Sequence, residues 1–161
     1  KIRAAVDSRQ NEATLVIART DALAVEGFDA AIERALKYAA AGADILFVEA
    51  LRDEEEMRRA ARILSPHAPL LANMVEGGRT PLRTQKELAA MGFSLVIAPG
   101  ALARAFAFMA EEFLTTLVKD GSTAGYAPRM RSFDEINAMI GLGEMLEAGA
   151  AYDASARKAA E

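Results

Sequence analysis

Four short apolar runs, each continuous rather than alternating with polar residues, stand out along the chain. They are rich in Val, Ile and Leu and cover residues 14–19, 44–49, 69–74 and 93–98. Continuous runs of this kind are typical of strands that are covered on both faces, as in a parallel sheet. The intervals between them leave room for one helix and two short loops. The pattern therefore predicts an α/β fold with four successive parallel βα units.

Helical patterns fill these intervals and continue to the C-terminus. Apolar residues at helical spacing cover 28–39 and 101–119. Three helix starts show the capping-box pattern, in which Asp, Thr or Ser is followed three residues later by Glu, at Asp53, Thr84 and Ser132. The last of these opens a C-terminal helical region that has no strand of its own to cover.

Composition narrows the class of protein. The chain has 161 residues, a length that favours one domain, and its formal net charge of −4 gives no reason to expect binding to nucleic acid. Membrane spans need about 20 consecutive apolar residues, and no run approaches that length. Cys is absent and His67 is the one histidine, which excludes thiolate sites and sites built from several imidazoles. We therefore expect a soluble, cytoplasmic protein with no nucleic-acid or membrane partner.

Polar side chains follow three of the four predicted strands. Arg19, Glu49 and Asn73 each come at the end of an apolar run. In parallel α/β folds ligands bind at the carboxyl ends of the strands. Arg can bind a carboxylate through two parallel hydrogen bonds, Glu can hold a hard cation directly or through water, and Asn can both donate and accept. The combination indicates a small, oxygen-rich anion bound together with a divalent metal. The alternative is that these residues are polar simply because strands end at solvent.

Three motifs resemble those of a known superfamily. They are Ala18-Arg19-Thr20-Asp21-Ala22, Gly42-Ala43-Asp44 leading into Phe47-Val48-Glu49-Ala50, and the stretch from Leu71 to Pro81, which contains Asn73-Met74-Val75-Glu76-Gly77-Gly78-Arg79-Thr80-Pro81. In order and spacing they resemble the isocitrate lyase/phosphoenolpyruvate mutase superfamily. The third motif is most similar to the branch of 2-methylisocitrate lyase, 2,3-dimethylmalate lyase and oxaloacetate-cleaving enzymes.

The resemblance implies a fold and an assembly. The superfamily fold is a TIM-type (β/α)8 barrel, and the resemblance implies that the four strands correspond to its C-terminal half. A whole barrel needs about 250 residues, so this chain is too short to hold eight units. We expect residues 1–161 to form a single domain, with a half barrel at 1–120 and a C-terminal helical extension at 121–161. We also expect a homo-oligomer in which end helices are exchanged between subunits.

The resemblance also implies roles for the strand-end residues. Arg19 binds the substrate's carboxylate and its carbonyl or alkoxide oxygen, and is the catalytic residue. Glu49 anchors Mg²⁺, largely through bound water, and Asn73 binds the distal carboxylate. The candidates for supporting roles are Asp21, Glu76, Gly77 and Gly78.

Two superfamily motifs are missing from the sequence. These are the metal-binding Asp-x-Asp and the Lys-Lys-Cys-Gly-His catalytic loop, both of which belong to the first half of the barrel. The chain also begins with Lys1 rather than Met. We therefore expect a fragment of a longer enzyme that is inactive alone. Val75 stands where 2-methylisocitrate lyases often have a hydroxyl residue, which leaves the exact substrate open.

The leading hypothesis is a Mg²⁺-dependent carbon–carbon lyase that cleaves a small 2-hydroxy or 2-oxo di- or tricarboxylate. The alternatives are a phosphonomutase of the same superfamily, a non-catalytic half barrel that binds only metal or dicarboxylate, and an unrelated flavodoxin-like domain, which the length would suit.

Overall fold

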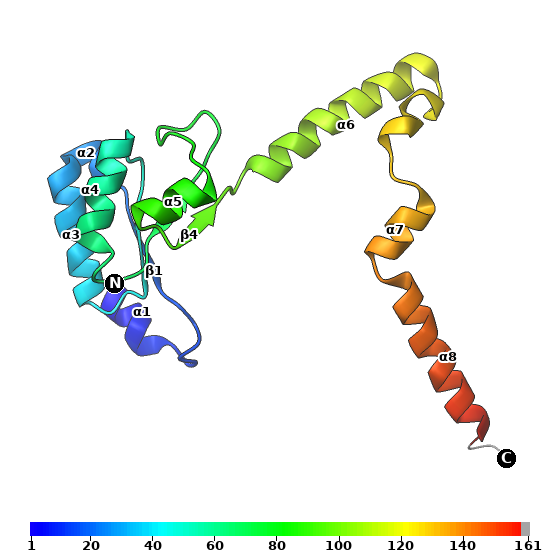
Figure 1. The fold of residues 1–161 in the computed structure, drawn as a ribbon, viewed down its shortest axis with the longest axis horizontal. Helices are drawn as coiled ribbons and strands as arrows, with labels where there is room; N and C mark the ends of the chain where they lie inside the picture. The colour runs from blue at the N-terminus through cyan, green and yellow to red at the C-terminus, as the bar shows by residue number, and fades with distance from the viewer. Residues whose placement is uncertain (159–161) are drawn as a thin grey trace. The chain divides into compact units, whose positions relative to one another are not determined.

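A computed structural model of the protein describes residues 1–158, with side chains as far as Tyr152. Figure 1 shows the succession of helices and strands along the chain. The chain divides into two compact units, the first from Lys1 to Ala105 and the second beginning at Phe106. The assignment of 1–161 to a single domain, with a boundary at residue 120, stays a prediction. Its last three residues lie outside the described part of the chain.

Four short parallel strands form the sheet of the first unit. They are β1 (Ile17–Thr20), β2 (Ile45–Val48), β3 (Leu71–Asn73) and β4 (Leu95–Ile97). Strand β1 pairs with β2 and β3 pairs with β4, both in parallel, and a single parallel bridge between Leu46 and Leu70 connects the two pairs. The predicted strands and their sequential order are therefore confirmed.

The strands are shorter than the apolar runs that predict them. Strand β1 begins at Ile17 rather than at residue 14, and it ends at Thr20, so Arg19 is its penultimate residue. The backbone before β1 still takes part in the fold, because the carbonyl of Val16 accepts hydrogen bonds from the amides of Asp44 and Ile45. The length of a strand depends on where its backbone hydrogen bonds with the neighbouring strand begin and end. A run of apolar residues does not show these positions.

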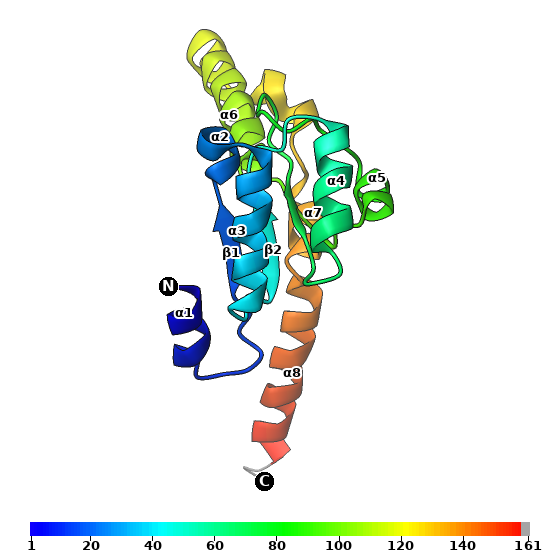
Figure 2. The ribbon, with the colours of Figure 1, turned by 90° about the vertical axis from the view of Figure 1, so that its left-hand side faces the viewer.

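Helices alternate with the strands. They are α2 (Ala22–Glu26), α3 (Phe28–Ala40), α4 (Glu54–Leu64) and α5 (Gln85–Met91), and α6 (Ala101–Asp120) follows β4. Helix α3 packs on both β1 and β2 and also contacts α4, as Figure 2 shows from the side. A short helix that the apolar pattern does not reveal, α1 (Ile2–Ser8), precedes β1 and has no buried residue.

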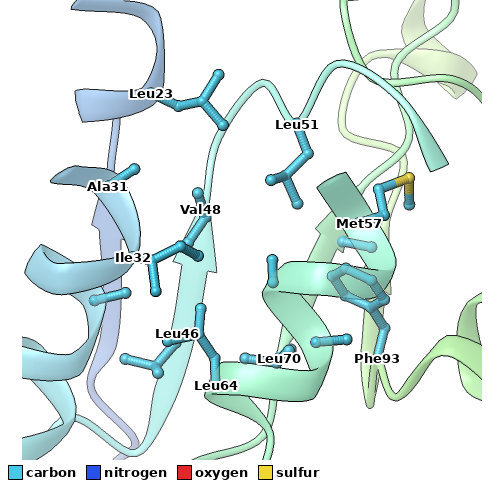
Figure 3. Packing of buried hydrophobic residues seen from close by; sticks show 14 of the residues in the cluster. Leu23, Ala31, Ile32, Leu46, Val48, Leu51, Met57, Leu64, Leu70 and Phe93 are labelled. Atoms are coloured by element: carbon cyan, nitrogen blue, oxygen red, sulfur yellow. The ribbon is translucent and has the colours of Figure 1, made fainter. Parts of the chain in front are cut away.

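The main core lies between the sheet and these helices (Figure 3). Its most deeply buried large apolar side chains are Leu46, Met57, Leu64 and Leu88. On the other face of the sheet a smaller cluster joins Ile45, Phe47 and Leu71. All four residues of β2 are therefore buried, as the continuous apolar run predicts.

Strand β1 departs from that prediction. It lies at an edge of its sheet and alternates exposed and buried residues, with Ile17 46% exposed and Ala18 3% exposed. Strand β4 is not fully covered either, since Leu95 is 38% exposed. These outer strands each pair with one neighbour only, so no side chains of a second flanking strand help to cover their exposed residues.

Two of the three capping boxes are complete. At Thr84 and Ser132 the hydroxyl accepts from the amide of the Glu three residues later, and that Glu carboxylate accepts from the amide of the capping residue. Asp53 also caps its helix, but the carboxylate of Glu56 accepts from the amide and guanidinium of Arg52 instead. The third box is therefore only half formed.

The second unit is helical, as predicted. After α6 come a 3₁₀ helix η1 (Ala124–Arg129), α7 (Phe133–Met139) and α8 (Leu142–Lys158). Neither α6 nor α7 has a buried residue, and their exposed apolar side chains include Phe106, Phe108, Phe133 and Met139. Among the described residues, no helix is long and apolar enough to cross a bilayer.

Candidate functional site

The strand-end residues Arg19, Glu49 and Asn73 come together at one edge of the sheet. Arg19 pairs in register with Phe47, and the carbonyl of Thr20 accepts from the amide of Glu49 at 3.0 Å. Oε2 of Glu49 lies 3.5 Å from Nη2 of Arg19 and accepts a hydrogen bond from Nδ2 of Asn73 at 3.2 Å. One carboxylate oxygen of Glu49 thus lies beside the side chains of Arg19 and Asn73, which are far from it in the sequence. This is expected for parallel strands whose carboxyl ends meet.

The backbone directly after Glu49 is strained. Ala50 has a φ of 64°, and it is the only non-glycine residue with a positive φ among those described. Residues of this kind cost about 1–3 kcal/mol in sparsely populated conformations and occur often at functional sites. The turn allows the chain to leave β2 sharply while the Glu49 side chain, 23% exposed, stays beside Asn73.

Replacing Ala50 with glycine should raise the free energy of unfolding by about 0.5–1 kcal/mol. The left-handed conformation costs an L-residue roughly 1–2 kcal/mol, and the larger unfolded-state entropy of glycine offsets part of the gain. Urea denaturation followed by circular dichroism measures the change. As a matched control, Ala60→Gly in the interior of α4 should lower the free energy of unfolding by about 1 kcal/mol. Equal destabilisation by both variants would contradict the assigned strain.

Asp21 and Phe47 orient the guanidinium of Arg19. Nε and Nη2 of Arg19 donate to the two carboxylate oxygens of Asp21 at 3.0 and 2.8 Å, and the guanidinium carbon lies 5.0 Å from the centre of the Phe47 ring. The hydrogen bond raises the pKa of Arg19 and lowers the pKa of the Asp21 carboxyl. The pair is therefore ionised at neutral pH and is lost only as the pH falls through the lowered pKa of Asp21. Nη1 has no hydrogen bond among the described residues, so this end of Arg19 remains for a ligand.

Asn73 has a buried acceptor that the fold does not use. Its Oδ1 is buried and has no hydrogen-bond partner within the described part of the chain. Buried acceptors are nearly always satisfied, so this atom indicates a missing donor such as a ligand hydroxyl or a bound water. Beside it lies a hollow of about 20 Å³, lined by Glu49, Asn73, Val75, Gly78, Arg79 and Thr80. That volume holds roughly one water molecule, so a carboxylate substrate must bind outside the hollow rather than within it.

The donor set fits part of a site for a hard cation. A carboxylate oxygen and an amide oxygen are ligands that Mg²⁺ accepts, directly or through water. Among the described residues, however, no three acidic or histidine side chains are close enough together to hold a metal ion. Glu49 and Asn73 are therefore suited to contribute to a metal site and not to complete one.

Of the candidate supporting residues, some lie at the site and others do not. Asp21 joins the site through Arg19, and Gly78 lines the hollow. Gly77, with a φ of 76°, lies within the turn that leads to Gly78. The carboxylate of Glu76 is paired with Arg104 at 3.2 Å and does not line the hollow.

Four residues at or near the site were missed by the sequence interpretation. Arg79 and Thr80 belong to the third motif, so their position in that stretch could have pointed to them. Phe47 and Arg104 have no local signal, since a ring under Arg19 and a contact between distant segments are tertiary features.

A larger hollow lies elsewhere, within the second unit. It measures about 600 Å³ and is lined by residues of α6 and η1, among them Glu112, Tyr126 and Arg129. Arg129 is paired there with Glu112 at 2.8 Å, and none of the strand-end residues takes part. Size alone therefore does not locate the candidate site, which rests on the chemistry of its residues.

Known proteins resemble this chain over most of its length. The sequence model of the phosphoenolpyruvate phosphomutase family matches residues 1–117. A 2,3-dimethylmalate lyase of Eubacterium barkeri is 44% identical over 147 residues, which cover 91% of this chain and 50% of the relative. The chain spans about half the length of the curated relatives it matches.

Solved structures agree with the fold. The structure of oxaloacetate acetylhydrolase with its product oxalate matches with a TM-score of 0.80 at 35% identity, covering 94% of this chain and 52% of that one. A phosphonopyruvate hydrolase in complex with oxalate and Mg²⁺ matches with a TM-score of 0.78 at 26% identity, covering 94% and 54%. The predicted α/β fold with parallel strands is confirmed, as part of a larger structure in each case.

Proposed function

Because this chain belongs to the phosphoenolpyruvate mutase/isocitrate lyase superfamily of TIM-type barrels, we propose that it forms part of a magnesium-dependent carbon–carbon lyase. Its substrate would be a small 2-hydroxy or 2-oxo di- or tricarboxylate, of the 2,3-dimethylmalate, 2-methylisocitrate or oxaloacetate type. The observation that supports this most is the shared oxygen of Glu49, which contacts both Arg19 and Asn73. A cation, a carboxylate and an unsatisfied amide oxygen within hydrogen-bonding reach suit an anionic substrate bound beside a metal.

Arg19 would bind and stabilise the reacting end of the substrate. Cleavage breaks a carbon–carbon bond and leaves the electron pair on the carbon next to a carboxylate or carbonyl group, as an enolate. A fixed guanidinium, held by Asp21 and the Phe47 ring, meets that negative charge without reorganising. Arg suits this role better than Lys because it remains protonated and presents a planar fork.

Glu49 and Asn73 would serve the metal and the rest of the substrate. Glu49 would hold Mg²⁺ largely through bound water, and when bound the ion would polarise the oxygen on which charge develops. Asn73 would bind the distal carboxylate through its Nδ2, which can donate a second hydrogen bond beside the one that it gives to Glu49. Its Oδ1, unsatisfied among the described residues, would accept from a substrate hydroxyl or a water. We assign no general acid or base among the residues gathered here.

Replacing Glu49 with glutamine tests the metal part of this proposal. The change removes a negative charge and should raise the Mg²⁺ concentration needed for half-maximal oxalate binding by about 10- to 100-fold, as for other residues that hold a metal through its surrounding shell. Isothermal titration calorimetry with oxalate at a series of Mg²⁺ concentrations measures it. Glu33→Gln, which removes an exposed carboxylate paired with Lys37, should leave the requirement unchanged. An unchanged requirement in Glu49→Gln contradicts the role of Glu49.

Turnover assays on the full-length protein separate the rival functions. Release of a 2-oxo acid or dicarboxylate from the three candidate substrates supports the lyase. Interconversion of phosphoenolpyruvate and phosphonopyruvate would support the phosphonomutase, an activity related to that of the matching phosphomutase family. Binding of Mg²⁺ and oxalate without any turnover would support the non-catalytic half barrel.

We also propose that the protein is a cytoplasmic homo-oligomer with exchanged C-terminal helices. The support is the apolar surface of the second unit, where Phe106 is 62% exposed and Phe133 is 89% exposed. Many large apolar side chains exposed on one unit are typical of an interface. The cytoplasmic location stays a prediction.

Light scattering tests the assembly. At about 10⁻⁵ M, well above the micromolar range of ordinary association, the protein should be larger than a monomer. Phe133→Glu, which places a charge on the apolar surface of α7, should shift it towards smaller species. A well-behaved monomer of the unaltered protein at this concentration would contradict the proposed oligomer.

A further inference from the structure

The amide group of Asn73 is fixed on one side only. Its Nδ2 donates to Oε2 of Glu49 at 3.2 Å, whereas its Oδ1 is buried and has no hydrogen-bond partner among the described residues. The backbone here is well held, since Asn73 pairs in register with Ile97 and the amide of Met74 donates to the carbonyl of Ile97 at 2.8 Å. The orientation of the amide group therefore depends on what donates to Oδ1.

Two small hollows adjoin Asn73, and Thr80 lines both of them. One measures about 20 Å³ and is also lined by Glu49 and Arg79. The other measures about 10 Å³, and its remaining lining residues are all apolar. Asn73 and Thr80 are the two residues that these hollows share, so the two side chains lie beside each other on both sides of the amide group.

Thr80 is the residue best suited to satisfy Oδ1. Apart from Asn73 itself, only Thr80 and Arg79 among the lining residues have a side-chain donor. Arg79 is exposed, and fixing its long side chain would cost more conformational entropy than fixing a threonine. Thr80 is half-buried, and its hydroxyl makes no hydrogen bond with the other described residues. Its hydrogen is therefore available to the Asn73 side.

The chain around Thr80 is restrained. Pro81 follows it, which restricts the backbone of Thr80 to an extended conformation. Further along, Nη2 of Arg83 donates to Oε2 of Glu54 at 3.1 Å and thereby connects this segment to the start of α4. The branched side chain of Thr80 is also stiff at its first torsion angle. The Thr80 hydroxyl thus has a defined place beside Asn73.

The larger hollow has the size and the polar groups that one bound water needs. A water requires roughly 10–15 Å³ and two to four polar partners. The hollow measures about 20 Å³, and its lining includes the side chains of Asn73, Thr80 and Glu49. A water there can donate to Oδ1 of Asn73 while it accepts from the hydroxyl of Thr80. It would be too small a space for a carboxylate.

We propose that Thr80 is a positioning residue for Asn73, and that it acts through one water bound in this hollow. The water gives Oδ1 its donor, so the amide group keeps Nδ2 directed at Glu49 and at the distal carboxylate of the substrate. Without it, Asn73 satisfies Oδ1 only by rotating towards solvent, which breaks the contact of Nδ2 with Glu49. The role in substrate binding rests on the proposed function, whereas the link between Thr80 and Asn73 does not.

High-resolution crystal structures of the full-length protein test this link. The unaltered protein should show a water within about 2.5–3.2 Å of both Oδ1 of Asn73 and Oγ1 of Thr80. In Thr80→Val, which keeps the shape of the side chain and removes the hydroxyl, this water should be lost or the Asn73 amide should be rotated. A water that contacts Oδ1 but not Thr80, or an unchanged water and amide in Thr80→Val, overturns the link.

Malate and lactate of the same configuration form a matched pair of ligands for the role in binding. Both carry a 2-hydroxy acid group, and only malate has a distal carboxylate. At saturating Mg²⁺, the Kd of malate should rise about tenfold in Thr80→Val, as expected when a buried acceptor loses its donor. The Kd of lactate should stay within about twofold, because lactate does not reach Asn73.

Two further variants complete the titrations. Thr80→Ser keeps the hydroxyl and should recover most of the malate affinity. Thr14→Val, which removes an exposed hydroxyl before β1, is the matched control and should change neither Kd. Unchanged malate affinity in Thr80→Val, or equal weakening of malate and lactate, overturns the role in binding the distal carboxylate. If the unaltered protein does not bind malate with Mg²⁺, the proposed function and this role both fail, while the crystal structures still decide the link between Thr80 and Asn73.

Discussion

Replacing Arg19 with lysine should lower kcat/KM by a factor that corresponds to about 2–4 kcal/mol of transition-state stabilisation, the loss typical of one donor to a developing oxyanion. Lysine keeps the positive charge, so an argument from charge alone predicts a small change in kcat/KM. The structure predicts a large one, because two nitrogens of Arg19 are held by Asp21 and its plane lies over Phe47. A flexible ammonium group cannot make the paired contact with Asp21 and still present a fixed donor to the substrate.

Steady-state kinetics of the full-length protein at saturating Mg²⁺ measures this effect. Arg34→Lys is the matched control, since Arg34 contacts both carboxylate oxygens of Glu26 on the helical side of the first unit. It should leave kcat/KM within about threefold, or ~0.7 kcal/mol. If Arg19→Lys is equally mild, Arg19 is a structural residue and its assignment to the site is wrong.

Truncating Leu46 to alanine should lower the free energy of unfolding by about 2–5 kcal/mol, the range for buried leucines. Leu46 lies in the middle of β2 and is 1% exposed. Figure 3 shows it among Ile32 of α3 and Leu64 of α4, and its backbone forms the bridge to Leu70. The surrounding side chains come from a strand and two helices and cannot all move inward, so much of the space would remain as a cavity.

Urea denaturation of this variant is followed by circular dichroism. The midpoint and the dependence on urea concentration together give the change in the free energy of unfolding. Leu102→Ala removes the same atoms from a side chain that is 82% exposed and should change the free energy of unfolding by less than about 0.5 kcal/mol. Equal effects in the two variants would mean that the core in Figure 3 does not stabilise the fold.

Much of the local structure could be predicted from the sequence because it depends on neighbouring residues. Continuous apolar runs indicate the strands, and apolar residues at helical spacing indicate the helices between them. The complete boxes at Thr84 and Ser132 were predicted because their hydrogen bonds join residues only three positions apart. The half-formed box at Asp53 shows the limit of this reasoning, since a nearby arginine, Arg52, competes for Glu56.

Part of the candidate site could also be predicted from the sequence. Parallel strands bring their carboxyl ends to the same edge, so polar residues that follow successive strands must lie near one another. That rule was sufficient to group Arg19, Glu49 and Asn73, which share an oxygen of Glu49 in the structure. It could not say how each side chain is oriented.

The sequence by itself therefore determined the order of the elements, their parallel arrangement and the three residues at the strand ends, because each follows from local pattern or from one rule of topology. Only the tertiary structure decided that β1 is exposed on one face, that Ala50 takes a left-handed conformation, and that Arg104 donates to the carbonyl of Glu76. These features depend on which segments become neighbours when the chain folds. Arg104 and Glu76 lie on different elements, 28 residues apart, and no periodicity along the chain connects them.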